Sequence, residues 1–299
     1  AMNFAINYSP TAAELVRSGD ISLDLFKCPA RPELIEEVQA EFPLYVHFPL
    51  RVGLGHGDAT DKSGHPPDWS QIEALLRQTG TSFVNVHLNQ ETENFPRIPA
   101  TTSDPGHIEF LTECALRDLQ PLVERYGAER VIVENVSFWP GETLAPVVQP
   151  NLIRQVVEET GCGFLLDVSH ARIAAHALEV EAWDYIQALP LNRTGEIHIT
   201  GLQTADTPVL SKLRTGGLAE ADIAQLAGQK IGHVPLTDQD WSFFAEVMAL
   251  VRRGECGRPQ VVTFEFGGSG SRWAALMDRE ALARQAPRLY ALVKAEDRV

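Results

Sequence analysis

The chain of 299 residues is 44% hydrophobic and carries 40 acidic against 25 basic side chains, which gives a formal charge of −15. That charge argues against binding to nucleic-acid backbones or anionic lipid surfaces, and no run of about 18 apolar residues predicts a membrane span. A chain of this length can bury one large core, so we expect a single domain over residues 1–299.

Four cysteines, Cys28, Cys114, Cys162 and Cys256, are scattered along the chain without C-x-x-C spacing. In a chain too long to depend on disulfides, this pattern predicts reduced thiols. The N-terminus lacks the basic-then-apolar layout of a secretion signal, so we expect a cytoplasmic protein.

Short β-branched or aromatic runs alternate with amphipathic patterns along the chain. The runs predict strands at residues 4–8, 21–26, 44–48, 83–88, 131–134, 164–168, 196–199 and 261–266. Apolar residues at three-to-four spacing predict helices at residues 10–17, 32–40, 69–78, 108–126, 152–160, 183–189, 241–251 and 278–294. Eight strand-helix repeats are the number that closes a barrel, so the expected fold class is α/β, a single (β/α)8 TIM barrel.

Three connections are longer than ordinary strand-helix loops: residues 49–68, 89–107 and 200–237. All three follow predicted strands, so they would lie over the C-terminal mouth of the barrel, where such folds place their chemistry. We expect them to shape the substrate site, although they could also simply decorate the rim.

Seven short apolar runs end in, or are closely followed by, a histidine or a carboxylate. These polar residues are His47, His87, Glu134, Asp167, His198, His233 and Glu265. Their spacing of roughly 30 to 50 residues is about one strand-helix unit, so the side chains would recur at the same end of successive strands.

The carboxylates among them carry the strongest signal. Glu134 and Asp167 each follow several large apolar residues, where a charged group is costly to bury unless a cation neutralises it, and Glu265 repeats the arrangement. His198 adds an imidazole from the strand between them. Such a mixed oxygen and nitrogen set suits Mn, Fe, Zn or Co, so we expect a divalent metal site.

The remaining histidines leave alternatives open. His47 and His87 would either hold a second ion, with Glu134 as a bridge, or bind substrate and transfer protons. His233 is either a ligand or a local hydrogen-bonding residue. His170, three residues after Asp167 at a strand-to-helix junction, is either a further ligand or a general acid/base beside the metal.

Several stretches resemble one known family. They are residues 161–168, which contain the Asp167 strand, residues 184–190, residues 196–201, and the segments around Glu134-Asn135, His47 and His87. They are similar to the multinuclear non-haem iron-dependent oxidative enzymes, formerly a domain of unknown function, within the xylose-isomerase-like TIM barrels. The resemblance covers most of the chain.

The resemblance implies a set of iron ligands and an oxidative activity. The implied ligands are His47, His87, Glu134, Asp167, His198, His233 and Glu265, and members of the family oxidise residues of small peptides, often with a partner protein that presents the peptide. We therefore expect iron-dependent oxidation of a peptide or small thiol. Glu134, Glu265 and His170 would serve catalysis, whereas Asn135, Asn89 and His170 would contact substrate.

The chain also departs from the pattern of that family. Ser169 and His170 stand where an asparagine is usual, Ile231 stands where an aspartate precedes the histidine, and a carboxylate is missing after Glu265. With two carboxylates fewer, we expect one or two divalent ions, iron first and manganese or zinc as alternatives.

Two other activities remain as alternatives. Glu134, Asp167, His198 and Glu265 also match in order the ligands of manganese-dependent sugar isomerases and epimerases of the same superfamily, in which two glutamates shuttle a proton. A related endonuclease branch uses three zinc ions on DNA, but the acidic charge counts against it. A third class is a metal-binding or partner-dependent scaffold without turnover.

Overall fold

Nine parallel strands and one antiparallel pair make up the two sheets. The computed structural model describes residues 2–139 and 141–295, so residue 1 and residues 296–299 of the expected domain lie outside it. The strands are β1 (Asn3–Asn7), β2 (Leu25–Pro29), β3 (Leu44–His47), β4 (Arg51–Val52), β5 (Val84–Leu88), β6 (Val131–Glu134), β7 (Gly163–Asp167), β8 (Thr194–Ile199), β9 (Gly201–Thr204), β10 (Lys230–Val234) and β11 (Val261–Phe264). The large sheet has the order β3-β2-β1-β11-β8-β7-β6-β5-β4.

The two ends of this sheet are joined directly in the chain, because β3 runs into β4 through residues 48–50. The backbone N–H of His87 on β5 donates to the carbonyl of Leu50 at 2.9 Å. Between the end of β3 and β5, a side chain takes the place of backbone hydrogen bonds. The side-chain amide of Asn85 on β5 accepts from the Phe48 N–H at 2.7 Å and donates to the Phe48 carbonyl at 3.0 Å. If β3 and β4 are counted as one interrupted strand, the nine become eight, and the expected α/β barrel is confirmed.

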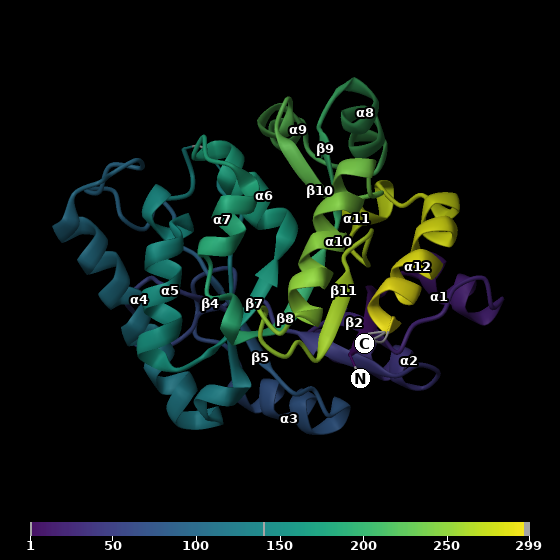
Figure 1. Ribbon diagram of the computed structural model, residues 1–299, viewed down its shortest axis with the longest axis horizontal. Helices are drawn as coiled ribbons and strands as arrows, with labels where there is room; N and C mark the ends of the chain where they lie inside the picture. Colours follow the sequence, from purple (N-terminus) through teal and green to yellow (C-terminus); the bar gives the residue numbers. More distant parts are fainter. Residues whose placement is uncertain (1, 140, 296–299) are drawn as a thin grey trace.

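Helices surround the strands (Figure 1). They are α1 (Pro10–Arg17), α2 (Pro32–Gln39), α3 (Trp69–Thr79), α4 (Pro105–Tyr126), α5 (Pro150–Thr160), α6 (Val168–Ala177), α7 (Ala182–Ala188), α8 (Thr207–Thr215), α9 (Glu220–Leu226), α10 (Asp238–Arg252), α11 (Ser271–Ala275) and α12 (Arg279–Lys294). Every residue of β6 and β11 is buried, as expected for parallel strands that are covered on both faces. No helix in residues 2–139 and 141–295 is long and apolar enough to cross a membrane.

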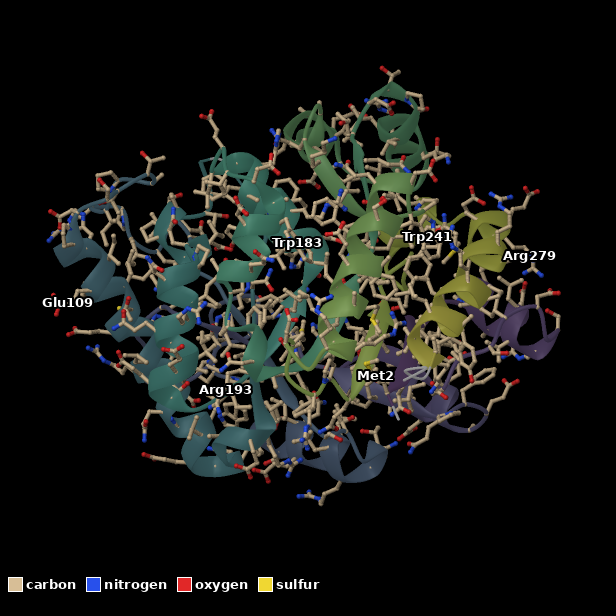
Figure 2. All side chains as sticks on the ribbon, in the orientation of Figure 1. Met2, Glu109, Trp183, Arg193, Trp241 and Arg279 are labelled. Carbon is tan, nitrogen blue, oxygen red and sulfur yellow. The ribbon has the colours of Figure 1, made fainter. Side chains whose placement is uncertain are left out.

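Charged side chains lie outside the helical layer. Figure 2 shows Glu109 on α4 and Arg279 on α12 at opposite edges of the molecule, and both are exposed. The two chain ends lie near each other in Figure 1, where the ammonium group of Lys294 donates to the Met2 carbonyl at 2.8 Å.

Residues 201–234 form an insertion above the mouth of the barrel, built from β9, α8, α9 and β10 (Figure 1). The insertion has its own small apolar core, made of Ala205, Leu213, Ile223, Leu226, Ile231, Val234 and Leu276. Gly201 allows the close approach at its base, because a Cβ there would collide with the Pro235 backbone. Much of the expected loop 200–237 is thus regular structure.

Several expected boundaries differ from the structure by a few residues, and two of the differences have a clear physical cause. The strand expected at residues 21–26 lies instead at residues 25–29, as β2. Just before this strand, the Asp24 side chain accepts a hydrogen bond from the Phe4 N–H at 2.7 Å, and within it Lys27 is a buried residue. Val168, expected as the end of a strand, begins α6 because the Asp167 side chain caps that helix. The helices α8, α9 and α11 were not expected from the sequence pattern, whereas α6 was expected only as a strand-to-helix junction at His170.

Closure of the barrel predicts a stability effect at Asn85, whose side chain is 2% exposed. Asn85→Ala leaves the N–H and carbonyl of buried Phe48 without partners, so the free energy of unfolding should fall by about 2 to 4 kcal/mol. Urea denaturation in the presence of a chelator measures this change. The exposed Asn151→Ala serves as control and should stay within about 0.5 kcal/mol of the parent. An equal, small effect of both substitutions would contradict this account of closure.

Candidate metal centre

The C-terminal ends of five barrel strands bring predicted site residues together. His47 ends β3, His87 lies in β5, and Glu134, Asp167 and His198 lie in β6, β7 and β8. The strand register places His87 beside Glu134 and Asp167 beside His198. A cavity of about 430 Å³ opens above them and is lined by His47, His87, Glu134, His170, His233 and Glu265, among others.

Glu134 is the hub of this cluster and is 2% exposed. Its Oε2 lies 3.3 Å from Nε2 of His87 and 3.5 Å from Nε2 of His47. Nδ1 of His87 lies 3.0 Å from the Leu50 carbonyl, so the ring carries its proton there and turns a lone pair toward Glu134. Burial lowers the pKa of His87, which keeps this ring neutral. A cation between these two acceptors would satisfy both of them.

Several ligand atoms in the cluster are buried without a hydrogen-bond partner. They are Nδ1 of His47, Oε2 of Glu134, Oδ2 of Asp167 and Nδ1 of His198. Buried polar atoms in native proteins are almost always paired, so a cluster of orphaned atoms at one place indicates a missing ligand. Carboxylate oxygens and imidazole nitrogens are a donor set that suits Fe, Mn or Zn, so these residues fit a divalent metal.

Three groups of described residues have ligand atoms within 4.8 Å of one another and could each hold an ion. They are His47, His87 and Glu134; Glu134, Asp167 and His198; and His47, Glu196 and His198. Glu134 belongs to the first two groups. The carboxylate of Glu134 can therefore bridge two ions, as the position of this residue in the sequence suggested.

The acid groups of the cluster are electrostatically unequal. Burial raises the pKa of Glu134, but His87 and His198 outweigh it and hold the pKa at about 2. Burial outweighs the effect of His170 on Asp167, and with the nearby Glu265 and Glu134 it raises the pKa of Asp167 to about 6. A metal ion removes this conflict because it stabilises both carboxylates in the ionised form.

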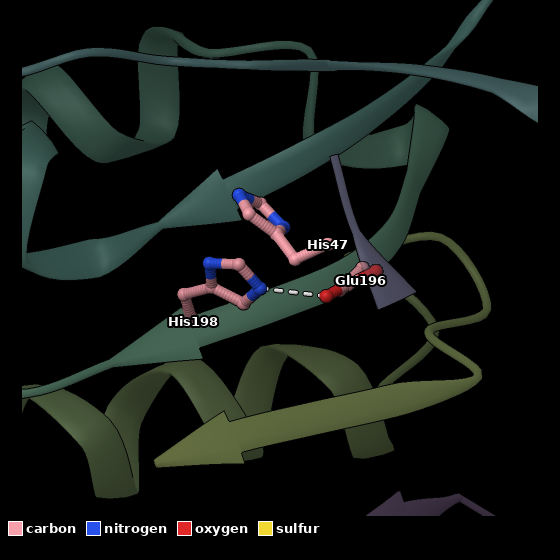
Figure 3. A group of neighbouring side chains, drawn as sticks. All are labelled: His47, Glu196 and His198. Atoms are coloured by element: carbon pink, nitrogen blue, oxygen red, sulfur yellow. Dashed lines mark hydrogen bonds and ion pairs between the residues drawn. The ribbon is translucent and has the colours of Figure 1, made fainter. Parts of the chain in front are cut away.

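Buried polar side chains contact His198, and Figure 3 shows the hydrogen bond between its ring and Glu196. Nε2 of His198 lies 2.6 Å from Oε1 of Glu196, and the Tyr45 hydroxyl donates to the same oxygen at 2.7 Å. Nδ1 of His198 is then left for the metal, 3.2 Å from Oε1 of Glu265. A carboxylate on the far nitrogen of a ligating histidine fixes its tautomer and raises its basicity. Glu196, which also lies near His47, therefore acts as a support for His198.

The start of α6 holds Asp167 and His170 beside Glu134. The His170 N–H donates to Oδ1 of Asp167 at 2.7 Å, while Nδ1 of His170 lies 3.4 Å from Oδ2 of Asp167 and 3.6 Å from Oε1 of Glu134. Nδ1 also lies 3.0 Å from the Asn135 carbonyl. His170 lines the cavity, so it is placed either to bind an ion or to transfer a proton there.

The structure corrects the expected substrate contacts of the two asparagines. Asn135 is 1% exposed, and its side-chain amide pairs with both the N–H and the carbonyl of Asp167, each at 2.9 Å. It therefore positions Asp167. Asn89 donates to Glu91 at 2.8 Å and is not among the described residues that line the cavity.

His233 and Glu265 lie on the opposite side of the centre. His233 has a left-handed backbone with φ of 59°, stacks on Trp273 with ring centroids 3.9 Å apart, and places Nε2 at 3.9 Å from Oε2 of Glu265. Glu265 also forms a buried ion pair with Lys27 of β2. These two predicted ligands are therefore close to the cluster, but Glu265 faces a lysine.

Sequence reasoning missed Lys27, Tyr45 and Glu196. Alternation along a strand could have revealed two of them, because residues two apart point to the same face. Tyr45 precedes His47 in β3, and Glu196 precedes His198 in β8, so both lie one layer below a ligand. Lys27 gave a weaker signal, a lone charge between the buried Phe26 and Cys28.

The fold is similar to that of solved barrels of the xylose-isomerase-like type. The structural alignment with a xylose isomerase domain containing protein from Salmonella typhimurium covers 98% of this chain and 97% of that protein, with a TM-score of 0.54 and 16% identity. The alignment with a D-psicose 3-epimerase covers 97% of each of the two chains, with a TM-score of 0.53 and 13% identity. At such identities the likeness concerns the fold alone.

Residues 26–214 match the sequence model of the family described as RiPP precursor modification enzyme MbnB/TglH/ChrH. Because this match covers more than half of the chain, the protein belongs to that family of enzymes, which confirms the expected resemblance. RiPP denotes a ribosomally synthesised and post-translationally modified peptide.

Curated relatives carry the description UPF0276 protein. One from Caulobacter vibrioides is 27% identical over 172 residues, which are 56% of this chain and 57% of the relative. One from Rhizobium meliloti is 24% identical over 253 residues, or 84% of this chain and 72% of the relative. The match thus spans little more than half the length of the Caulobacter relative.

Because Glu134 belongs to two of the ligand groups, substitutions of single ligands should change the metal content by different amounts. Glu134→Gln should lose both ions, whereas Asp167→Asn should lose only the ion on the His198 side, because the His47 and His87 group stays complete. Elemental analysis of protein purified without oxygen measures the ions per chain. The buried Asp118→Asn, an acid outside the centre, should keep the full content. Full occupancy in Glu134→Gln would refute the assignment.

Glu196→Gln should weaken metal binding at His198 by about tenfold or more, because the neutral amide no longer raises the basicity of the ring. Competition with a chelator gives the dissociation constant. Tyr45→Phe keeps the Glu196 charge and should have a smaller effect. An unchanged dissociation constant in Glu196→Gln would show that the carboxylate plays no part in metal binding.

Proposed function

We propose that this protein is an iron-dependent enzyme that uses oxygen to oxidise a residue of a small peptide, with a small thiol as a further candidate substrate. The observation that carries the proposal is the buried Glu134 carboxylate, which two groups of ligand residues share and whose Oε2 has no hydrogen-bond partner. Membership of a family that modifies precursor peptides supports the substrate class. We take the centre to hold two ions, with manganese and zinc as alternatives to iron.

Bound iron would supply the electrons with which oxygen is reduced. The residues of the chain would hold the substrate beside that centre and manage protons. Burial lowers the pKa of His170, but Asp167, Glu134 and Glu265 raise it overall above its usual value, which favours the protonated ring. From its place in the cavity wall, His170 would donate that proton to a product oxygen.

The cavity has the size and lining for a short segment of chain. Its volume of about 430 Å³ lies in the ordinary range for small-ligand sites. Arg31 and Lys62 line it above the acidic floor, so the rim is basic although the whole protein is acidic. The insertion of residues 201–234 would cover a bound peptide and exclude water.

Sugar isomerisation with manganese is the weaker alternative. That chemistry requires Glu134 and Glu265 to pass a proton between carbons, and Glu265 is held by the ammonium group of Lys27. A carboxylate so paired is a poor base, since Lys27 holds the pKa of Glu265 well below its usual range despite burial. A substrate-presenting partner protein and a cytoplasmic location stay predictions.

Oxygen consumption separates the two activities. Protein loaded with ferrous iron should take up oxygen when given cysteine-bearing peptides, including glutathione, and mass spectrometry should find a change in peptide mass. The same protein loaded with manganese should do neither. Incorporation of solvent deuterium into ketoses by the manganese form, with no uptake of oxygen by the iron form, would contradict oxidation and favour the isomerase. His170→Gln should retain metal but slow the peptide oxidation by about 100-fold.

A further inference from the structure

Lys27 is a cation that the fold builds into the wall of the metal centre. It lies in β2, where the register places it between Asn7 of β1 and Tyr45 of β3. Its side chain is 8% exposed, and its ammonium group contacts Oε1 of Glu265. Charged side chains are rarely buried to this extent unless they are paired, so this ion pair is a fixed part of the site.

The surroundings of Glu265 have the composition of a metal site. Oε1 of Glu265 lies 3.2 Å from Nδ1 of His198, and Oε2 lies 3.9 Å from Nε2 of His233. One carboxylate and two imidazoles would suit a divalent ion. The positive charge in contact with Glu265 is instead the ammonium group of Lys27.

Glu134 and Glu265 therefore differ in what they offer a metal. Oε2 of Glu134 is buried without a hydrogen-bond partner, whereas Glu265 is paired with Lys27. The balance of charge around the centre also disfavours a further ion beside Glu265. Four buried carboxylates, Glu134, Asp167, Glu196 and Glu265, would face two divalent ions and one ammonium group, which together already exceed their negative charge. A further dication near Lys27 would meet repulsion in a poorly screened interior.

We propose that Lys27 takes the place of a cation beside Glu265 and thereby limits the centre to the two ions that share Glu134. This inference rests on the proposed function only for the presence of the two-ion centre. Lys27 is thus a positioning residue, which holds Glu265 and sets the metal stoichiometry.

Removal of the ammonium group should open a further metal position. Lys27→Met keeps the length of the side chain without its charge, and after anaerobic equilibration with ferrous iron it should hold about three ions per chain, against about two in the parent. The added ion should be lost again in the Lys27→Met, Glu265→Gln double variant. Lys27→Arg keeps the charge and should stay at about two, as should Lys62→Met, which removes an exposed lysine of the cavity wall. Elemental analysis gives each number.

Two results would overturn the inference: about three ions in the parent, or no added ion in folded Lys27→Met. If Lys27→Met does not fold, anomalous scattering from crystals of the metal-loaded parent decides, since a third peak between Lys27 and Glu265 overturns the inference and its absence beside two occupied positions supports it. A parent chain that binds no metal at all would instead defeat the proposed function. The two failures are therefore distinguishable.

Discussion

The rest of the centre depends on the burial of one carboxylate at the end of a barrel strand. Glu134 follows three residues that are fully buried and is itself 2% exposed, so solvation by water cannot stabilise its charge. The surrounding histidines hold the pKa of Glu134 at about 2, but its Oε2 still lacks a hydrogen-bond partner and faces Nε2 of His87 at 3.3 Å. A cation satisfies both groups at once. The same requirement extends outward to Asp167 and His198, whose orphaned atoms lie around the second position.

The barrel makes that convergence possible through its register and its closure. Parallel pairing sets His87 level with Glu134 and Asp167 level with His198, so ligands that are far apart in sequence meet at one height. The seam between β3 and β5 depends on Asn85, whose amide bonds the Phe48 backbone and also lies 3.1 Å from Nε2 of His47. One side chain therefore joins the closing of the fold to the placing of a ligand. A fault at this seam would displace the histidine side of the centre first.

Much of this could be predicted from the sequence, because the fold and the ligands produce local patterns. Repeated strand-helix units indicate a barrel, and a carboxylate at the end of an apolar run indicates a site, as at Glu134 and Asp167. Lys27 could not be predicted in the same way, since a charge inside a short run also reads as the end of a strand, and its partner Glu265 is 238 residues away. The helical insertion was hidden for a similar reason. Its small core includes Leu276, which lies outside the segment, so the pattern within residues 201–234 is incomplete.

Ile231 shows how the insertion and the metal centre constrain each other. In the family that the sequence resembles, an aspartate stands at this position, two residues before the histidine, and would add a carboxylate beside His233. Here Ile231 is 3% exposed and packs in the core of the insertion, so β10 uses that position for stability. His233 is left with a left-handed backbone and a stacked Trp273, facing a Glu265 that is already paired with Lys27. The absence of that carboxylate and the presence of Lys27 act in the same direction, because each makes this side of the mouth less able to hold an ion. Under the proposed function, this side of the cavity would bind the substrate, and the metal chemistry would be confined to the side of Glu134.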